Sequence, residues 1–198
     1  MCGRFTLFTP ASRLAGMFLP GEAVSLAPRY NIAPSQPVLT VRVSARSGRR
    51  EFAMPRWGLV PAWAKDTSIG SRLINARSET VAEKPAFRRA FRERRCLVPA
   101  DGFYEWQKLG GRKQPHFIGF KDGRPFAFAG LWEAWHPDQE DALLSCTIIT
   151  TTPNALTEKI HNRMPVILKP DAYPVWLDPA EQTPDKLDKL LKPYPAAH

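Results

Sequence analysis

The sequence has no long hydrophobic run and few cysteines. No apolar segment approaches the 18 residues that a membrane-spanning helix needs, and the apolar stretch at 14–19 is short and contains a glycine. We therefore expect no membrane partner and no secretory signal. The three cysteines, at positions 2, 96 and 146, form no CxxC pair and leave one thiol unpaired in any disulfide scheme. This usage is typical of a reducing compartment and predicts a cytoplasmic protein.

Acidic residues are scarce relative to basic ones. The chain has 28 Lys and Arg residues against 19 Asp and Glu residues, which gives a net charge of +9 and a pI of about 9.8. The charge is concentrated at 42–56, with five arginines and one glutamate, and at 84–95, with six basic residues and one glutamate. Like charges four residues apart on a helix repel, so the second cluster favours a bound phosphate backbone over a merely solvated helix face.

The chain lacks internal repeats, Gly/Ser linkers and low-complexity tracts, which predicts a single domain over 1–198. Alternating and β-branched residues predict mostly short strands. These are expected at 2–8, 38–43, 96–98, 103–107, 117–120, 126–131 and 143–151. The Asp-Gly pair within 121–124 predicts a hairpin turn between two of them. Twenty prolines agree with short elements joined by tight turns.

Thr-Pro pairs predict helices that begin near residues 10, 153 and 184, because a threonine hydroxyl can cap a helix whose first residue is proline. A further helix is expected over 85–95, and a C-terminal helix and tail over 180–198. Strands and helices do not alternate regularly. The expected fold class is therefore α+β, a single domain of curved, mostly antiparallel and barrel-like sheet flanked by short helices.

The first residues, Met-Cys-Gly-Arg-Phe, suggest a nucleophile. Because Cys2 is small, removal of the initiator methionine would leave it as the mature N-terminus, with an amine and a thiol on adjacent carbons. Such a pair captures an aldehyde in two steps, first as a Schiff base and then as a five-membered thiazolidine. An α-amine with a pKa near 8 is about 10% neutral at pH 7, so it needs no special burial to react. Taken alone, Cys2 could equally be a small buried hydrophobe.

Further blocks follow this N-terminus in a fixed order. They are Tyr-Asn-Ile-Ala-Pro at 30–34, Trp-Gly-Leu-Val-Pro-Ala-Trp at 57–63, Asn-Ala-Arg-Ser-Glu-Thr at 75–80, Cys-Leu-Val-Pro at 96–99 with Gly-Phe-Tyr-Glu-Trp at 102–106, and His-Asn-Arg-Met-Pro at 161–165. Together these blocks, within residues 2–170, closely resemble the signature of the SRAP family, the SOS-response-associated peptidase domain of bacteria and of a eukaryotic abasic-site sensor. The resemblance covers nearly the whole chain.

The resemblance implies a protein that traps abasic sites covalently, without a cofactor. Cys2 would be the nucleophile. Asn75 would orient the amine or bind the opened sugar, and Glu105 would move protons on and off the reacting groups. His161 would protonate the sugar ring oxygen. The resemblance also implies AP-lyase activity and removal of Met1 by the protein itself.

From the residues alone, two of these roles have alternatives. Glu105 shares a strand face with Phe103 and Gln107, which leaves its direction open. His161 could be a partner for a helix C-terminus.

The expected partner is single-stranded DNA that contains abasic sites, bound by a monomer that is nucleoid-associated when on DNA. Arg4, Arg77 and Arg163 lie in the blocks and are expected at phosphates near the lesion. Trp63 is the candidate for base stacking, although Ala64 follows it where the family often has a second tryptophan. The full set of expected DNA-binding residues is Arg4, Asn31, Trp63, Arg77, Lys84, Arg88 and Arg163.

Two other functions fit the sequence. One is a cysteine peptidase with Cys2 and His161 as a dyad, and the other is a module that binds single-stranded nucleic acid without covalent chemistry. A metal site is not expected, because the cysteines and the histidines at 116, 136, 161 and 198 lack the spacing of metal ligands.

Overall fold

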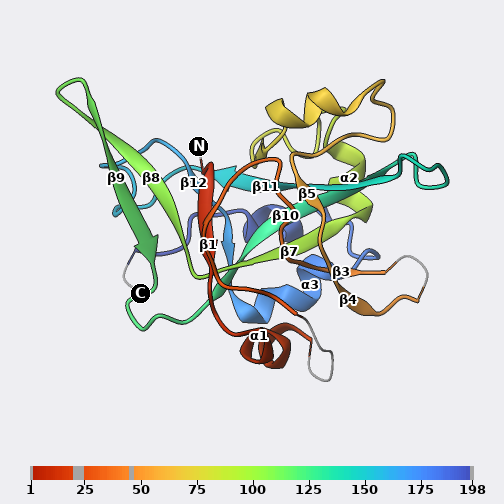
Figure 1. Cartoon of the computed structure of the whole chain (residues 1–198), viewed down its shortest axis with the longest axis horizontal. Helices are drawn as coiled ribbons and strands as arrows, with labels where there is room; N and C mark the ends of the chain where they lie inside the picture. The colour runs from red at the N-terminus through yellow and green to blue at the C-terminus, as the bar shows by residue number, and fades with distance from the viewer. Residues whose placement is uncertain (1, 20–24, 45–46, 197–198) are drawn as a thin grey trace.

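Two β-sheets form the body of the protein (Figure 1), in a computed structural model that describes residues 2–19, 25–44 and 47–196. The smaller sheet contains, in order, β2 (Arg29–Ile32), β1 (Arg4–Leu7), β8 (Gly102–Leu109) and β9 (Arg112–Gly119). The larger sheet contains, in order, β12 (Met164–Pro165), β11 (Leu143–Thr151), β10 (Phe126–Trp135), β7 (Arg95–Ala100), β3 (Thr40–Val43) and β4 (Arg50–Ala53). Three short strands pair with members of this row: β13 (Ile167–Leu168) pairs with β10, and β5 (Arg56–Trp57) and β6 (Asn75–Arg77) pair with β11.

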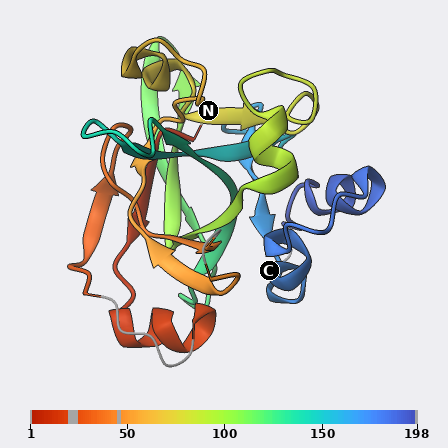
Figure 2. The same cartoon turned by 90° about the vertical axis from the view of Figure 1, so that its right-hand side faces the viewer.

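The larger sheet curls into a half-barrel, as a second view shows (Figure 2). Its strands are antiparallel except for β5 and β6, which run parallel to β11. Both features confirm the α+β fold class of curved, mostly antiparallel sheet. Short helices flank it: α1 (Ala11–Phe18), η1 (Thr67–Arg72), α2 (Arg88–Glu93), η2 (Pro170–Ala172), α3 (Tyr173–Leu177) and α4 (Pro184–Leu190). Of the helices in the described ranges, none has both the length and the apolar content needed to cross a bilayer.

The helix predictions are confirmed at two positions and corrected at two others. Helices begin after Pro10 and at Pro184 as expected, although Pro10 and not Thr9 caps α1. The helix expected near 153 is wrong, because residues 155–160 form turns instead. The Asn154 side chain caps these turns by accepting the backbone N–H groups of Leu156 and Thr157. The helix expected over 85–95 is shorter, since Arg95 already begins β7.

The hairpin expected at 121–124 is also wrong. Gly123 does adopt a left-handed conformation with φ +67°, but β9 pairs with β8 and β10 pairs with β7, β11 and β13, so the turn carries the chain from one sheet to the other. The real hairpin joins β8 to β9 through Gly110 and Gly111, whose φ angles are +53° and +83°. Two successive positive φ angles match the twist of the flanking strands and favour glycine at both positions.

Aromatic side chains from both sheets form the core that holds β1 in place. Phe5 of β1 contacts Trp57 with ring centroids 5.3 Å apart and Phe128 of β10 at 5.8 Å. Phe103 of β8 contacts Phe128 at 6.0 Å. All four rings are fully buried, and burying each contributes about 2 kcal/mol. The strand that follows the N-terminus is therefore fixed against both sheets.

Asp101 separates β7 from β8 and marks the point where the chain changes sheets. Its carboxylate is buried and accepts hydrogen bonds from the backbone N–H of Phe8 at 2.5 Å and of Thr9 at 2.8 Å, and from the Thr9 hydroxyl. Thr9 therefore anchors the end of β1 to this corner instead of capping α1.

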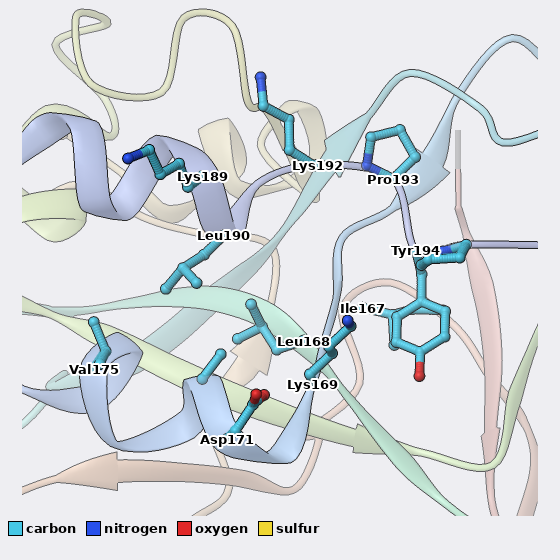
Figure 3. Close-up of a pocket in the computed structure, with 12 residues that line it drawn as sticks. Ile167, Leu168, Lys169, Asp171, Val175, Lys189, Leu190, Lys192, Pro193 and Tyr194 are labelled. Atoms are coloured by element: carbon cyan, nitrogen blue, oxygen red, sulfur yellow. The ribbon is translucent and has the colours of Figure 1, made fainter.

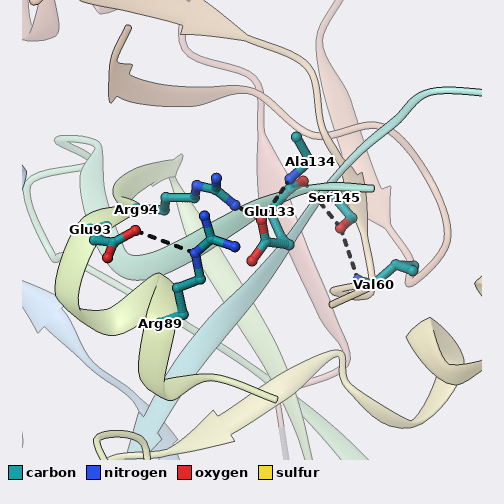
Figure 4. Close-up of polar contacts among 7 residues, drawn as sticks. All are labelled: Val60, Arg89, Glu93, Arg94, Glu133, Ala134 and Ser145. Carbon is teal, nitrogen blue, oxygen red and sulfur yellow. Dashed lines mark hydrogen bonds and ion pairs between the residues drawn. The ribbon is translucent and has the colours of Figure 1, made fainter. Parts of the chain in front are cut away.

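The basic run at 84–95 does not form one surface. Arg95 is 3% exposed and donates to five backbone carbonyls, those of Phe91, Arg92, Trp176, Asp178 and Glu181. Arg94 pairs with the buried Glu133 of β10 (Figure 4). Burial lowers the pKa of both guanidinium groups. Two of the six cations therefore stabilise the fold, and the remaining four are the exposed ones.

Candidate functional site

The register of β1 on β8 brings the N-terminus to Glu105. Arg4 lies opposite Tyr104 and Phe5 opposite Phe103 in this antiparallel pair. Gly3 and Cys2 continue the chain from the start of β1 on the side toward Glu105. The Cys2 thiol lies close enough to Glu105 for the charge of that carboxylate to act on it, although the two residues are far apart in the sequence.

Asn75 holds Cys2 from the other sheet. β6 runs parallel to β11 with Asn75 opposite Ile148, and the side-chain Nδ2 of Asn75 donates to the backbone carbonyl of Cys2 at 2.9 Å. The Oδ1 of the same amide is buried and accepts no hydrogen bond from the described part of the chain. An amide fixed in this way offers one further acceptor at Cys2.

The Cys2 thiol is fully buried and donates weakly to the Arg4 carbonyl, with 4.0 Å between sulfur and oxygen. Burial raises the pKa of the Cys2 thiol far above its usual range, and the negative charge of Glu105 raises it further. The sulfur is consequently a neutral thiol at physiological pH.

Glu105 points into the protein, which settles the direction that strand alternation left open. It is 2% exposed and shares the interior face of β8 with the buried Phe103. Together with His161 it lines a pocket of about 300 Å³, which Trp106, Lys108 and Lys113 complete. Two of the predicted catalytic residues therefore share one pocket.

The segment that carries His161 is tied to β8 and to its own backbone. The Gln107 amide donates to the Lys159 carbonyl at 2.7 Å, and the Nδ1 of His161 accepts the Arg163 backbone N–H at 3.0 Å. Because Nδ1 accepts this bond, the neutral ring carries its proton on Nε2. The histidine can therefore present a donor from Nε2.

The structure gathers the four predicted catalytic residues through three separate connections. Cys2 is bonded to Asn75, Cys2 is close enough to Glu105 for its pKa to respond to that charge, and Glu105 shares a pocket with His161. The constellation combines a thiol, an amide, a carboxylate and an imidazole. These groups can orient an N-terminal amine and transfer protons to and from a carbonyl compound.

Of the residues expected to bind DNA, four lie on strands or loops that adjoin these groups. Arg4 donates to the side chain of Asn31 at 2.8 Å on neighbouring strands. Arg77 is exposed and lies opposite Thr150 in the pair of β6 with β11. Arg163 donates to the Thr150 carbonyl and forms a two-pronged ion pair with Glu79.

The other three expected DNA-binding residues stand elsewhere. Trp63 is 61% exposed on the loop between β5 and η1, and that loop is held because the indole of Trp135 donates to the carbonyl of Ala64 at 2.8 Å. Lys84 is exposed in the turn before α2, and Arg88 is exposed at the first residue of α2, which packs on β7 and β10. The roles of these residues stay predictions.

Sequence reasoning missed Trp106, Lys108, Lys113 and His116 as neighbours of the site. The lysines line the same pocket as Glu105, and His116 lies opposite Glu105 on β9 and contacts Gln107 at 3.1 Å. The Gly-Gly pair was the available signal. A two-residue turn at 110 and 111 would have placed Lys108 opposite Lys113 and would have extended the strand beyond 107.

A second pocket of about 480 Å³ lies on β13, η2, α3, α4 and the chain that follows α4 (Figure 3). Leu168, Leu190 and Val175 line it together with Lys169, Lys189 and Lys192. It shares no lining residue with the pocket at Glu105. Within residues 2–19, 25–44 and 47–196, no group of three His, Cys, Asp or Glu side chains is arranged to hold a metal ion.

The comparisons with known proteins agree on one family. The family model for SRAP, the SOS response associated peptidase, matches residues 1–198. The abasic site processing protein YoqW of Bacillus subtilis (strain 168) is 48% identical over 203 residues, which cover 99% of this chain and 88% of that protein. The abasic site processing protein HMCES of Gallus gallus is 36% identical over 196 residues, which cover 84% of this chain and 58% of that protein.

Solved structures agree with these relatives. A crystal structure of a protein from Bacteroides thetaiotaomicron superimposes with a TM-score of 0.87 at 30% identity and covers 98% of this chain and 88% of that one. A crystal structure of a protein from Bordetella bronchiseptica gives a TM-score of 0.80 at 27% identity and covers 98% and 95%. With its whole length matched by the family model, the chain belongs to the SRAP family.

Proposed function

We propose that this protein binds single-stranded DNA and captures abasic sites covalently through Cys2 as the mature N-terminal residue. The observation that carries the proposal is the hydrogen bond from Asn75 to the Cys2 carbonyl, which holds the N-terminal residue beside Glu105 and the pocket of His161. Relatives with 46–48% identity bear the name abasic site processing protein, which supports the same substrate.

The reaction begins with the α-amine that removal of Met1 exposes. The amine nitrogen attacks the aldehyde carbon of the ring-opened abasic sugar and forms a C–N bond. The nitrogen gives up one proton while the carbonyl oxygen gains one, which forms a carbinolamine. The hydroxyl then leaves as water with the second proton from nitrogen, and a Schiff base results. The Cys2 sulfur then adds to the imine carbon while its proton passes to nitrogen. The product is a five-membered thiazolidine, with no oxidant or cofactor consumed.

The neighbouring groups have distinct roles in these steps. The Oδ1 of Asn75 accepts one N–H of the amine, so that the nitrogen lone pair is directed at the aldehyde. Glu105 takes the amine proton and returns it to the departing hydroxyl. His161 donates from Nε2 to the sugar ring oxygen and so favours the open aldehyde.

The protonation state of the thiol supports this order of events over cysteine peptidase chemistry. A cysteine peptidase attacks with a thiolate, whereas burial and the charge of Glu105 keep the Cys2 sulfur protonated. In the proposed reaction the amine attacks first, and the neutral thiol acts only after the imine has formed.

The proposed function includes two further activities. The same imine permits β-elimination of the DNA strand, which is an AP-lyase activity. The protein would also remove its own Met1.

The DNA would lie across the arginines that surround the site. Arg4, Arg77 and Arg163 supply phosphate contacts, with Asn31 bound to Arg4 and with Trp63 available for stacking. Lys84 and Arg88 would contact the strand farther from the lesion. The protein acts as a monomer in this scheme.

The test is a crosslinking assay with a single-stranded oligonucleotide that carries one abasic site. The wild-type protein should form an adduct that survives heat, and its intact mass should equal chain without Met1 plus oligonucleotide minus one water. A chain that retains Met1, or an absence of adduct, would refute the proposal.

Cys2→Ser separates the two chemical steps. This variant keeps the amine, so borohydride should still trap its Schiff base while the unreduced heat-stable adduct disappears. Cys146→Ala is the matched control, because Cys146 is equally buried and equally free of disulfides, and it should crosslink like wild type. If Cys2→Ser crosslinks as durably as wild type, thiazolidine formation is wrong. A peptidase would instead cleave unrelated peptides in a Cys2-dependent manner.

A further inference from the structure

The β8–β9 hairpin extends beyond the rest of its sheet. β1 pairs with Gly102–Tyr104 of β8 alone, whereas β8 and β9 remain paired to Leu109 and Arg112 at the tip. The outer half of this hairpin, residues 106–115, projects from the body (Figure 1). We refer to these residues as the hairpin arm. The arm carries Lys108, Arg112 and Lys113 and contains no acidic residue.

Lys108 and Lys113 lie directly opposite each other on the arm. Directly opposed residues have Cβ atoms about 5 Å apart, and like charges at such positions destabilise a sheet. Neither lysine is buried or needed for packing, since both are exposed. The pair therefore has a cost in the free protein, and an anion placed between the two ammonium groups would remove it.

The two lysines also line the pocket that contains Glu105 and His161. The lining thus holds two lysine side chains against one carboxyl group, together with the His161 imidazole. This excess of basic groups favours an anion such as a phosphodiester at the pocket. The pocket opens beside the residues that would hold the abasic sugar, so a phosphate bound there would belong to the DNA strand that carries this sugar.

We propose that Lys108 and Lys113 form a phosphate subsite that holds one backbone phosphate of single-stranded DNA next to the abasic sugar. This inference rests on the proposed function for the identity of the ligand. The subsite binds the strand and takes no part in proton transfer. It places the lesion at Glu105 and His161, while Arg112 at the tip of the arm is free to meet a phosphate farther along.

The effect on binding can be worked out from counterion release. On single strands each neutralised phosphate contributes about 0.7 to the slope of log affinity against log salt. Loss of one contact therefore weakens binding about four-fold at 0.15 M salt. The double variant Lys108→Gln/Lys113→Gln should show both changes on an undamaged single-stranded oligonucleotide, as measured by fluorescence anisotropy over a series of salt concentrations.

Three controls isolate the subsite. Lys189→Gln/Lys192→Gln removes the same charge from the rim of the C-terminal pocket and should leave the slope unchanged. Lys108→Arg/Lys113→Arg keeps both charges and should retain the wild-type slope. The urea midpoint of the glutamine double variant should equal or exceed that of wild type, because the repulsion between the lysines is gone.

The proposal is overturned if the glutamine variant keeps the wild-type slope, if the control pair lowers the slope equally, or if the urea midpoint falls. These outcomes are separate from failure of the proposed function, because the salt slope is measured on DNA without a lesion. With abasic DNA, the glutamine variant should require a higher DNA concentration than wild type for half-maximal crosslinking. Lack of a crosslink with wild-type protein would count against the covalent chemistry, while the salt slopes would still decide the subsite.

Discussion

Replacement of Asp101 by alanine tests whether one buried carboxylate holds the corner between the two sheets. The carboxylate accepts two backbone N–H groups, from Phe8 and Thr9, and the Thr9 hydroxyl. Asp101 and Thr9 are 5% and 7% exposed, so water cannot readily replace the lost acceptor. The end of β1 and the start of the segment to α1 should therefore both lose their anchor.

The size of this loss of stability follows from the number of backbone N–H donors left without an acceptor. A hydrogen bond to a charged group contributes about 1.5–3 kcal/mol, and a buried donor left without a partner costs about 1–3 kcal/mol. Because both N–H groups bond to the same oxygen, the contributions do not add fully. We expect Asp101→Ala to lower the free energy of unfolding by about 4 kcal/mol. At about 2–4 °C per kcal/mol for a chain of this length, the Tm should fall by roughly 8–16 °C.

Urea denaturation followed by circular dichroism measures this loss, with an unchanged m-value as the check that the denatured state is the same. Thr9→Val is the matched control, since it removes the hydroxyl donor and leaves both backbone bonds, and it should cost about 1 kcal/mol. A loss below about 1 kcal/mol in Asp101→Ala would instead show that packing alone holds the corner.

Four further predictions concern single groups. Hydrogen bonds from Arg163 lower the pKa of Glu79. The stabilisation that they give is therefore present above the unfolded pKa of a glutamate and is lost as the pH falls through the folded pKa. Glu79→Gln should make the urea midpoint depend less on pH below about pH 5, by less than about 1 kcal/mol because the pair is partly exposed. Arg95→Met should lower the free energy of unfolding by about 3–4 kcal/mol in urea, because buried carbonyls lose their donor. Trp63→Ala should change stability by less than about 0.5 kcal/mol yet weaken binding of single-stranded DNA by about 1–3 kcal/mol in anisotropy titrations. Cys2 should react with iodoacetamide at pH 8 much more slowly in the native protein than in urea, as read by intact mass, because burial raises the pKa of its thiol.

Local sequence patterns predicted where the helices and strands lie better than they predicted which strands pair. The β-branched, apolar run at 143–151 matches β11 residue for residue, and the threonine-proline pair at 183 and 184 matches the start of α4. The Asp-Gly turn at 122 and 123 does form, but the strands on its two sides join different sheets. Turn chemistry is local, whereas the choice of partner strand depends on which faces the aromatic core buries.

The residues of the candidate site were predicted from the resemblance to a known family, and not from local patterns such as strand alternation. Alternation placed Glu105 on the same face as Phe103 but could not say which face is interior, and burial of both resolves this. No local signal links Asn75 to Cys2, because their contact joins two sheets. The charge run at 84–95 misled in a similar way, since Arg94 and Arg95 turn inward to Glu133 and to backbone carbonyls.

The way the site is assembled separates two classes of residue. Cys2 is fixed by the register of β1 on β8 and by Asn75 on the other sheet, so its position depends on the corner that Asp101 holds between the sheets. Changes at that corner should therefore reduce stability and capture together. The lysines of the hairpin arm lie beyond the end of β1 and support no packing, so changes there should reduce affinity and spare stability. In the proposed function, rigid strands place the reactive groups while the hairpin arm contacts the DNA, so we expect that binding can be weakened at the arm without loss of stability.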